Sequence, residues 1–209
     1  MRRETQLLVL AKTPVAGRVK TRLCPPLTPF EAAAVAEAAL ADTLEAVAST
    51  RADRRVLVLD GAAGPWLPHG IEVIRQRGRG LDERLAHAFE DAGTPALLIG
   101  MDTPQVSASL LEHALASLAQ TDAVLGPARD GGYWAIGLKR PDPNVFLGVP
   151  MSSSRTLACQ RERLAALGLG VADLPTLTDV DTFEDASAVA SEARGRRFAA
   201  MVESAAAVS

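Results

Sequence analysis

The sequence contains little cysteine, few aromatic residues and no long hydrophobic run. Cys24 and Cys159 are the only cysteines among 209 residues, too few for a disulfide framework and at no spacing typical of a zinc site. Aromatic residues make up 4% of the chain, and no apolar segment approaches the length of a membrane span. These absences argue against a disulfide-rich secreted protein and predict a cytoplasmic protein with no membrane partner.

An excess of charge of one sign is also missing, because the formal net charge is only −3. A general nucleic-acid binder normally has a broad basic face, so we expect no nucleic-acid partner. One stretch departs from this balance: no Asp or Glu occurs between Glu4 and Glu31. The same stretch carries all four of its charges as cations, at Lys12, Arg18, Lys20 and Arg22.

The basic stretch follows residues 7–11, an unbroken apolar run typical of a strand buried on both faces of a parallel sheet. Further strands are expected at 55–60, 71–74, 95–100, 123–126, 133–138 and 171–174. Helices are expected from Thr28 to about Ser49, and at 81–92, 107–119, 152–167 and after Thr182, with Ser152 to Ser154 able to cap the fourth. This alternation predicts one α/β domain over residues 1–209, with a mostly parallel sheet.

Loops at the carboxyl ends of central strands are where open α/β sheets bind ligands, and clustered cations there need an anion. A solvated surface loop is the structural alternative. Gly17 lets the backbone approach a ligand, which favours phosphate. Neither a Walker loop nor a dinucleotide fingerprint is present. The predicted nucleotide-binding residues are Lys12, Gly17, Arg18, Lys20, Thr21 and Arg22.

Two acidic points could complete such a site. Asp102 ends an apolar strand, and Pro104 favours an extended Thr103 that holds this carboxylate at the sheet edge. Asp179 and Asp181 precede a helix, and alternate residues of an extended segment face opposite ways, so we expect only one of them, Asp181, to reach a metal. Each carboxylate also has a purely structural alternative: Asp102 could cap a turn, and Asp181 could stabilise the N-terminus of the helix. Carboxylates beside phosphates need a cation between them, which predicts Mg²⁺ or Mn²⁺ on Asp102 and Asp181.

The run Asp130, Gly131, Gly132 and Tyr133 predicts a tight turn whose glycines bring the backbone close to a ligand. A hairpin turn explains the first two residues but not the second glycine or the following aromatic pair. We therefore expect these four residues to bind substrate.

Five segments together resemble the bacterial radical-SAM/selenodomain-associated transferase family of the GT-A-like nucleotide-diphospho-sugar transferase superfamily. They are the segments 11–14, 17–23, 100–104, 126–133 and 179–182. The resemblance implies a GT-A fold with helices on both faces of the sheet. The family usually has Gly at Asp82, and Trp followed by Ser-Thr where Met151, Ser152 and Ser153 stand, in segments that could contact base or acceptor.

More distantly, the basic loop and both acidic segments are similar to those of 2-phospho-L-lactate and molybdenum cofactor guanylyltransferases. That similarity implies Lys20 and Arg22 on phosphates and Asp102 and Asp181 on the metal, with Lys20 and Asp102 as catalytic residues. The expected activity is magnesium-dependent nucleotidyl transfer from a nucleoside triphosphate to a small phosphorylated or oxyanion acceptor, releasing pyrophosphate. A glycosyltransferase using a nucleotide sugar and a non-catalytic nucleotide-binding protein are the alternatives, and the oligomeric state is left open.

Overall fold

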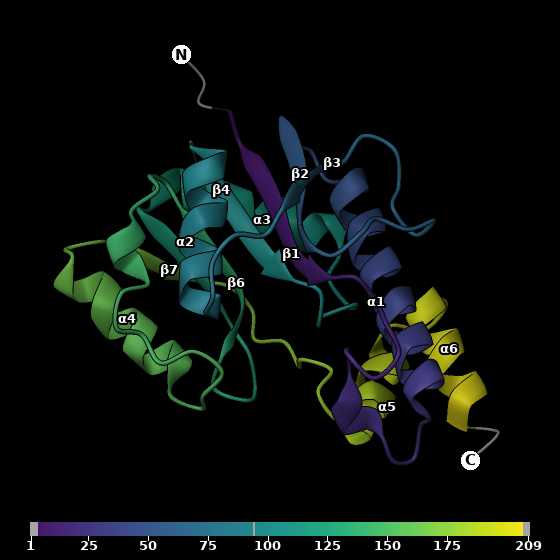
Figure 1. Cartoon of the computed structure of the whole chain (residues 1–209). Coiled ribbons are helices and arrows are strands. Elements are labelled where there is room, and N and C mark those ends of the chain that lie inside the picture. The colour runs from purple at the N-terminus through teal and green to yellow at the C-terminus, as the bar shows by residue number, and fades with distance from the viewer. Residues whose placement is uncertain (1–3, 94, 207–209) are drawn as a thin grey trace.

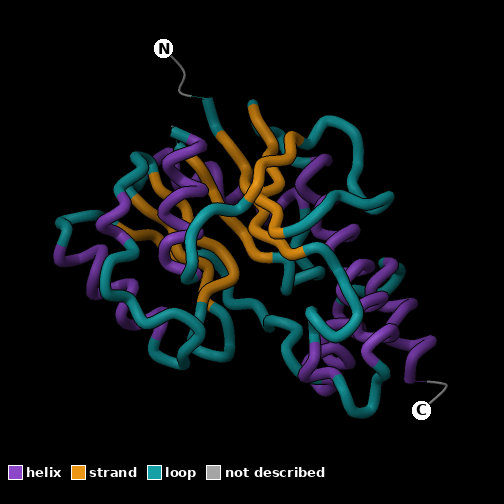
Figure 2. Tube along the Cα trace, viewed as in Figure 1, coloured by secondary structure: helices purple, strands orange, loops and turns teal. Residues whose placement is uncertain are grey.

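The computed structural model describes residues 4–93 and 95–206, which form one seven-stranded sheet in the order β3-β2-β1-β4-β6-β5-β7 (Figures 1 and 2). The strands are β1 (Gln6–Lys12), β2 (Arg54–Asp60), β3 (Glu72–Arg75), β4 (Ala96–Gly100), β5 (Ala123–Pro127), β6 (Tyr133–Leu138) and β7 (Val171–Asp173). The helices are α1 (Pro29–Ser49), α2 (Leu81–Ala92), α3 (Ala108–Gln120), α4 (Thr156–Ala166), α5 (Phe183–Glu192) and α6 (Arg197–Ala206), with short 3-10 turns at Thr21–Leu23 and Pro143–Val145.

The sheet is mostly parallel, as predicted, and β6 is the strand that runs against its neighbours. β1 pairs in parallel with β2 and β4, whereas β6 pairs antiparallel with both β4 and β5. Because β6 runs in the opposite direction, its first residue, Tyr133, lies at the edge where β1 and β4 end. That edge therefore collects the basic loop, the Asp102 segment and the turn before β6.

Apolar residues alternate between two buried clusters, one on each face of the sheet. Leu7 and Val9 of β1 pack in the cluster that contains α1 and α3, whereas Leu8 packs in the cluster that contains α2. This two-sided burial explains why the strand sequences are apolar without interruption. The prediction of helices on both faces is confirmed.

A third cluster joins the carboxyl-terminal helices to the outer side of α1. Phe198 and Val202 of α6 pack with Val189 of α5 and with Val35 of α1. Val180, from the acidic segment, is fully buried in the same cluster. In Figure 1 these helices form a separate corner beside the sheet edge, so the acidic segment crosses from the sheet to this corner.

Most predicted helix starts are confirmed by their caps. Thr28 and Thr182 each form a capping box, with Glu31 and Asp185 respectively. The start of α4 is different, because its N-cap is Arg155 and no side chain caps it. The prediction that Ser152 to Ser154 cap this helix is wrong, since these residues form a separate turn in front of it.

No helix built from the described residues has both the length and the apolar character needed to cross a bilayer.

Candidate active site

Lys20 is held in the middle of the site by an unusual backbone conformation. Its φ of 49° and ψ of 36° lie in the left-handed region, which non-glycine residues rarely occupy and which is often found at functional sites. The Nζ atom of Lys20 donates to Asp102 Oδ1 and to the Val180 carbonyl oxygen. The side chain is only 9% exposed, so Lys20 does not belong to a solvated surface loop.

The two acidic segments are joined by their backbones. Val180 N donates to the Asp102 carbonyl oxygen at 2.8 Å, and Gln105 Nε2 donates to the Thr178 carbonyl oxygen at 2.8 Å. These bonds place Asp102 and Asp181 at one edge of the sheet although 79 positions separate them in sequence. Arg22 pairs with Asp181 as Lys20 pairs with Asp102, so each predicted metal ligand contacts a predicted phosphate-binding cation.

Asp179 also lines this site, so the expectation that Asp179 and Asp181 face opposite ways is wrong, whereas the expectation that only Asp181 reaches a metal stays a prediction. Asp179 and Asp181 line the same cavity, because the segment that carries them is not a regular β-strand with alternating side chains. Burial, followed by the charges of Asp102, Asp130 and Asp181, raises the pKa of Asp179 from 3.8 to about 7. Its Oδ1 atom is buried without a hydrogen-bond partner.

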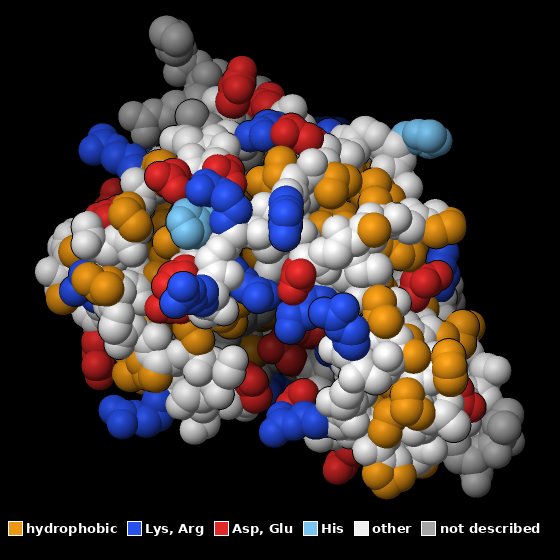
Figure 3. Space-filling view, in the orientation of Figure 1, with side chains coloured by type: hydrophobic (Ala, Val, Ile, Leu, Met, Phe, Trp, Pro, Cys, Tyr) orange, Lys and Arg blue, Asp and Glu red, His pale blue; other side chains and the backbone are white. Residues whose placement is uncertain are grey.

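Two cavities open at this edge and share a boundary. One, of about 530 Å³, is lined by six cationic side chains and two carboxylates; its cations are Lys12, Arg18, Lys20, Arg22, Arg79 and Arg84. The other, of about 810 Å³, is lined by the carboxylates of Asp102, Asp130, Asp179 and Asp181 and by residues of β6 and of the turn before α4. In Figure 3, Lys and Arg side chains surround a hollow in the middle of the face, with acidic side chains in its depth. Lys20 and Asp102 belong to both linings.

The predicted nucleotide-binding residues meet at the cationic cavity, except Gly17. Lys12, Arg18, Lys20, Thr21 and Arg22 all line it. Gly17 is absent from both linings, and a Cβ atom built on it would meet nothing within 4 Å. Its φ of 75° instead serves the turn in which Arg18 N donates to the Val15 carbonyl oxygen. The expectation that Gly17 brings backbone to a ligand is therefore not supported.

The turn before β6 is largely explained by local structure. Asp130 Oδ1 accepts from Gly132 N at 2.8 Å, which is an Asx-turn. Gly131 has a φ of 90° and approaches Ser154 rather than the cavity, since a Cβ on it would lie 2.1 Å from the Ser154 carbonyl oxygen. Asp130, Gly132 and Tyr133 line the larger cavity, as predicted, and Gly131 does not.

Tyr133 lines the larger cavity, but its hydroxyl is already hydrogen-bonded within the protein. Its hydroxyl donates to Gln160 Oε1 at 3.3 Å, and burial raises the pKa of Tyr133. Trp134 of the same strand donates to the Pro175 carbonyl oxygen at 2.9 Å and covers Gly126. The aromatic pair thus shapes the wall of the cavity and anchors the strand.

Sequence reasoning missed the cationic contribution of the segment around α2. Arg79 and Arg84 line the cationic cavity together with Gln76. Arg84 is oriented by Gln76 Oε1 at 3.2 Å and by Asp60 Oδ2 at 3.4 Å. Leu81 is 38% exposed and lines both cavities. The signal was available in the arginines around the Gly78–Gly80 break, at the end of a predicted strand next to the basic loop.

Residues 32–153 match the bacterial family DUF2064, described as an uncharacterized protein conserved in bacteria. The chain belongs to the DUF2064 family. A 3-phospho-D-glycerate guanylyltransferase of Phenylobacterium zucineum (strain HLK1) is 33% identical to the DUF2064 chain over 195 residues, which cover 86% of this chain and 88% of that protein. The predicted association with radical-SAM and selenodomain proteins is not tested by these matches and stays a prediction.

Solved structures confirm the fold of the DUF2064 chain. A protein of Desulfovibrio desulfuricans G20, assigned to the nucleotide-diphospho-sugar transferases, has a TM-score of 0.87 and 29% identity, covering 97% of this chain and 95% of its own. A cytidylyltransferase of Leptospira borgpetersenii serovar Hardjo-bovis (strain JB197) has a TM-score of 0.55 and 12% identity, covering 97% and 93%, which is a likeness of fold alone. The GT-A-like fold is confirmed, and the chain is a transferase rather than a non-catalytic binding protein.

Proposed function

We propose that this chain is a magnesium-dependent nucleotidyltransferase that transfers the nucleotidyl group of a nucleoside triphosphate to a small phosphorylated acceptor. The observation that carries the proposal is the shared boundary of the two cavities at Lys20 and Asp102. A cavity rich in cations suits a polyphosphate, and the adjoining cavity can place a second substrate against it. The relative that is a 3-phospho-D-glycerate guanylyltransferase makes GTP and 3-phospho-D-glycerate the first substrates to test.

In this reaction, an oxygen of the acceptor phosphate attacks the α-phosphorus of the triphosphate. A new bond forms between that oxygen and the α-phosphorus, and the bond from the α-phosphorus to the bridging oxygen of the β-phosphate breaks. The electron pair leaves with pyrophosphate, so the chain needs no nucleophile of its own. Lys20 and Arg22 would contact the triphosphate and stabilise the charge that grows on the departing pyrophosphate. An ionised acceptor phosphate also needs no general base.

The carboxylates fit a divalent cation. The charges of Asp102, Asp130 and Asp181 all raise the pKa of Asp179 in the larger cavity, and Asp179 Oδ1 is buried there without a hydrogen-bond partner among the described residues. Among the described residues no three His, Cys, Asp or Glu side chains form a complete metal cluster. Mg²⁺ takes one or two carboxylates and completes its shell with water and substrate phosphate. Asp102 and Asp181 would hold it, and when bound it would neutralise charge on the reacting phosphates.

Each of these carboxylates is paired with a cation before substrate binds. Lys20 with Asp102, and Arg22 with Asp181, form pairs that keep the edge of the site electrically balanced. A bound triphosphate offers negative charge to the two cationic side chains, and its divalent cation offers positive charge to the two carboxylates. We propose that these pairs open on binding, the cations turning to phosphate and the carboxylates to the metal.

The test is pyrophosphate release in a matrix of substrates. Purified protein with Mg²⁺ is given GTP, ATP, CTP or UTP, each with and without 3-phospho-D-glycerate, and separately GDP- and UDP-sugars. Acceptor-dependent pyrophosphate release from a triphosphate is the expected result. Turnover of a nucleotide sugar without any triphosphate activity would favour glycosyl transfer, the alternative supported by the relative from Desulfovibrio.

A further inference from the structure

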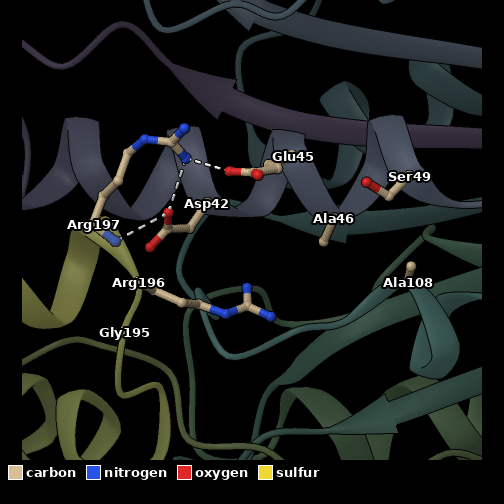
Figure 4. A pocket seen from close by; sticks show the side chains of 8 residues that line it. All are labelled: Asp42, Glu45, Ala46, Ser49, Ala108, Gly195, Arg196 and Arg197. Carbon is tan, nitrogen blue, oxygen red and sulfur yellow. Dashed lines mark hydrogen bonds and ion pairs between the residues drawn. The ribbon is translucent and has the colours of Figure 1, made fainter.

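A third cavity lies apart from the two cavities of the site, between α1, the start of α3 and the turn that joins α5 to α6. It measures about 520 Å³, and its lining includes Asp42, Glu45 and Ser49 of α1, together with Arg196 and Arg197 (Figure 4). None of these residues lines the two cavities of the proposed active site. One of them, Arg196, nevertheless contacts the segment that carries Asp102.

Arg196 makes this contact across 92 positions of sequence. Its Nη1 atom donates to the carbonyl oxygen of Pro104 at 2.9 Å. Pro104 is buried, and it lies two residues after Asp102, in the turn closed by Val106 N donating to the Thr103 carbonyl oxygen at 3.1 Å. The guanidinium thus holds the Asp102 turn from a cavity that shares no lining residue with the substrate cavities.

The backbone of Arg196 is itself fixed by a buried carboxylate. Asp42, whose side chain is 3% exposed, accepts from Phe198 N at 2.9 Å, from Arg197 N at 3.3 Å and from Arg197 Nη1 at 3.2 Å. Glu45 accepts from the same Nη1 atom of Arg197, as Figure 4 shows. The start of α6 is therefore anchored to α1, and Arg196 extends from a fixed point.

We infer that Arg196 is a positioning residue that sets the place of Asp102 from the carboxyl-terminal corner of the fold. This inference rests on the proposed function, because it takes Asp102 to act in the active site. The turn is held at two points, by Val180 N on the Asp102 carbonyl oxygen and by Arg196 Nη1 on the Pro104 carbonyl oxygen. A carboxylate that must meet a metal and a phosphate together tolerates little displacement, so losing one brace lowers turnover more than binding.

The experiment compares Arg196→Ala, Arg196→Lys and wild type, with Arg194→Ala as the matched control. Arg194 is an exposed arginine of the same turn, and within residues 4–93 and 95–206 its side chain forms no hydrogen bond or ion pair with the Asp102 segment. Steady-state kinetics give kcat and the KM for the triphosphate. Hydrogen exchange of peptides covering residues 102–106 and 178–182 reports the order of the two acidic segments without requiring activity.

For Arg196→Ala we expect kcat to fall by about 10- to 100-fold with little change in the KM for the triphosphate. Exchange should accelerate in both peptides, while the melting temperature stays close to that of wild type. Guanidinium ion, added well below denaturing concentration, should enter the opened cavity and restore part of kcat, whereas sodium at equal ionic strength should not. Arg196→Lys, which keeps one donor, should retain more activity than Arg196→Ala, and Arg194→Ala should match wild type.

Wild-type kcat and exchange in a folded Arg196→Ala would overturn the inference. So would a loss of kcat that follows a general loss of stability and is not rescued by guanidinium. If Arg196→Ala does not fold, Arg196→Lys and Arg196→Gln are compared instead. Wild-type kcat and wild-type exchange in both variants refute the positioning role of Arg196. A loss of kcat at unchanged melting temperature supports that role. If wild type turns over no substrate, the proposed function fails, and hydrogen exchange still tests whether Arg196 orders the Asp102 turn.

Discussion

Lys20→Ala is the substitution that most directly tests the electrostatic basis of the site. The Lys20 side chain is 9% exposed and contacts Asp102 and the Val180 carbonyl oxygen, at the boundary of both cavities. Removing it deletes a cation that we expect to exchange its carboxylate partner for a phosphate oxygen. A hydrogen bond to a charged group contributes about 1.5–3 kcal/mol. This corresponds to a fall of about 10- to 150-fold in kcat/KM for the triphosphate.

The same substitution should cost little stability, because Asp102 is 49% exposed and water can replace the lost partner. The backbone of Lys20 is left-handed, with φ at 49°. Comparing alanine and glycine at this position therefore separates the effect of backbone strain on stability from the effect of the lost charge on activity. Lys20→Gly should be more stable than Lys20→Ala by about 1 kcal/mol, since glycine adopts this conformation without strain. Both variants should lose the same activity, because the side chain and not the backbone binds phosphate.

The assay is pyrophosphate release at varied triphosphate concentration, combined with thermal melting of each variant. Lys139→Ala is the matched control, because Lys139 contacts the Ala119 carbonyl oxygen at 3.3 Å and lines neither cavity. If Lys20→Ala keeps wild-type kcat/KM, phosphate binding by Lys20 is refuted. If Lys20→Gly is active while Lys20→Ala is not, the backbone and not the charge is what matters.

Three further predictions concern the same edge of the sheet. Asp102→Ala should lower kcat by about 100-fold, equivalent to about 2.7 kcal/mol of barrier, with the fold intact by circular dichroism. Asp179→Asn should be more stable than wild type at pH 8 in metal-free buffer but not at pH 4, as measured by thermal melting. The pKa of Asp179 rises from 3.8 to about 7 on folding, so the folded state keeps a proton that the unfolded state releases, and stability falls as pH rises between these values. Gly131→Ala should destabilise by more than about 1 kcal/mol in urea unfolding, because its Cβ would lie 2.1 Å from the Ser154 carbonyl oxygen at a φ of 90°.

Each of these predictions has an outcome that contradicts it. Full activity in Asp102→Ala would remove Asp102 from the metal site. A stability difference for Asp179→Asn that is the same at both pH values would show that this carboxylate ionises normally in the folded chain. Gly17→Ala is the control for Gly131→Ala, because a Cβ there meets no atom within 4 Å and only the backbone is strained. Equal destabilisation by the two substitutions would show that contact with Ser154 is unimportant.

The order of elements and their caps could be predicted from local sequence alone. Thr28 with Glu31, and Thr182 with Asp185, form capping boxes as expected. These features depend on residues a few positions apart, so local patterns specify them. The uninterrupted apolar strands likewise indicated burial on both faces, and the structure shows a cluster on each side of β1.

The tertiary structure decided which side chains from distant parts of the sequence meet in the site. Local sequence contains cations at residues 12–22 and carboxylates at 102 and 181, but it is the bonds from Val180 N to the Asp102 carbonyl oxygen and from Gln105 Nε2 to the Thr178 carbonyl oxygen that bring the two acidic segments together. Strand alternation predicted that Asp179 and Asp181 face opposite ways, but both line the larger cavity, because that segment is irregular and follows the contacts made by its backbone. The reach of Arg196 to Pro104 has no local signal either. Local sequence determines elements and caps because short-range sterics and hydrogen bonds form them, whereas contacts across 80 or more positions exist only after the sheet and the helical corner have packed.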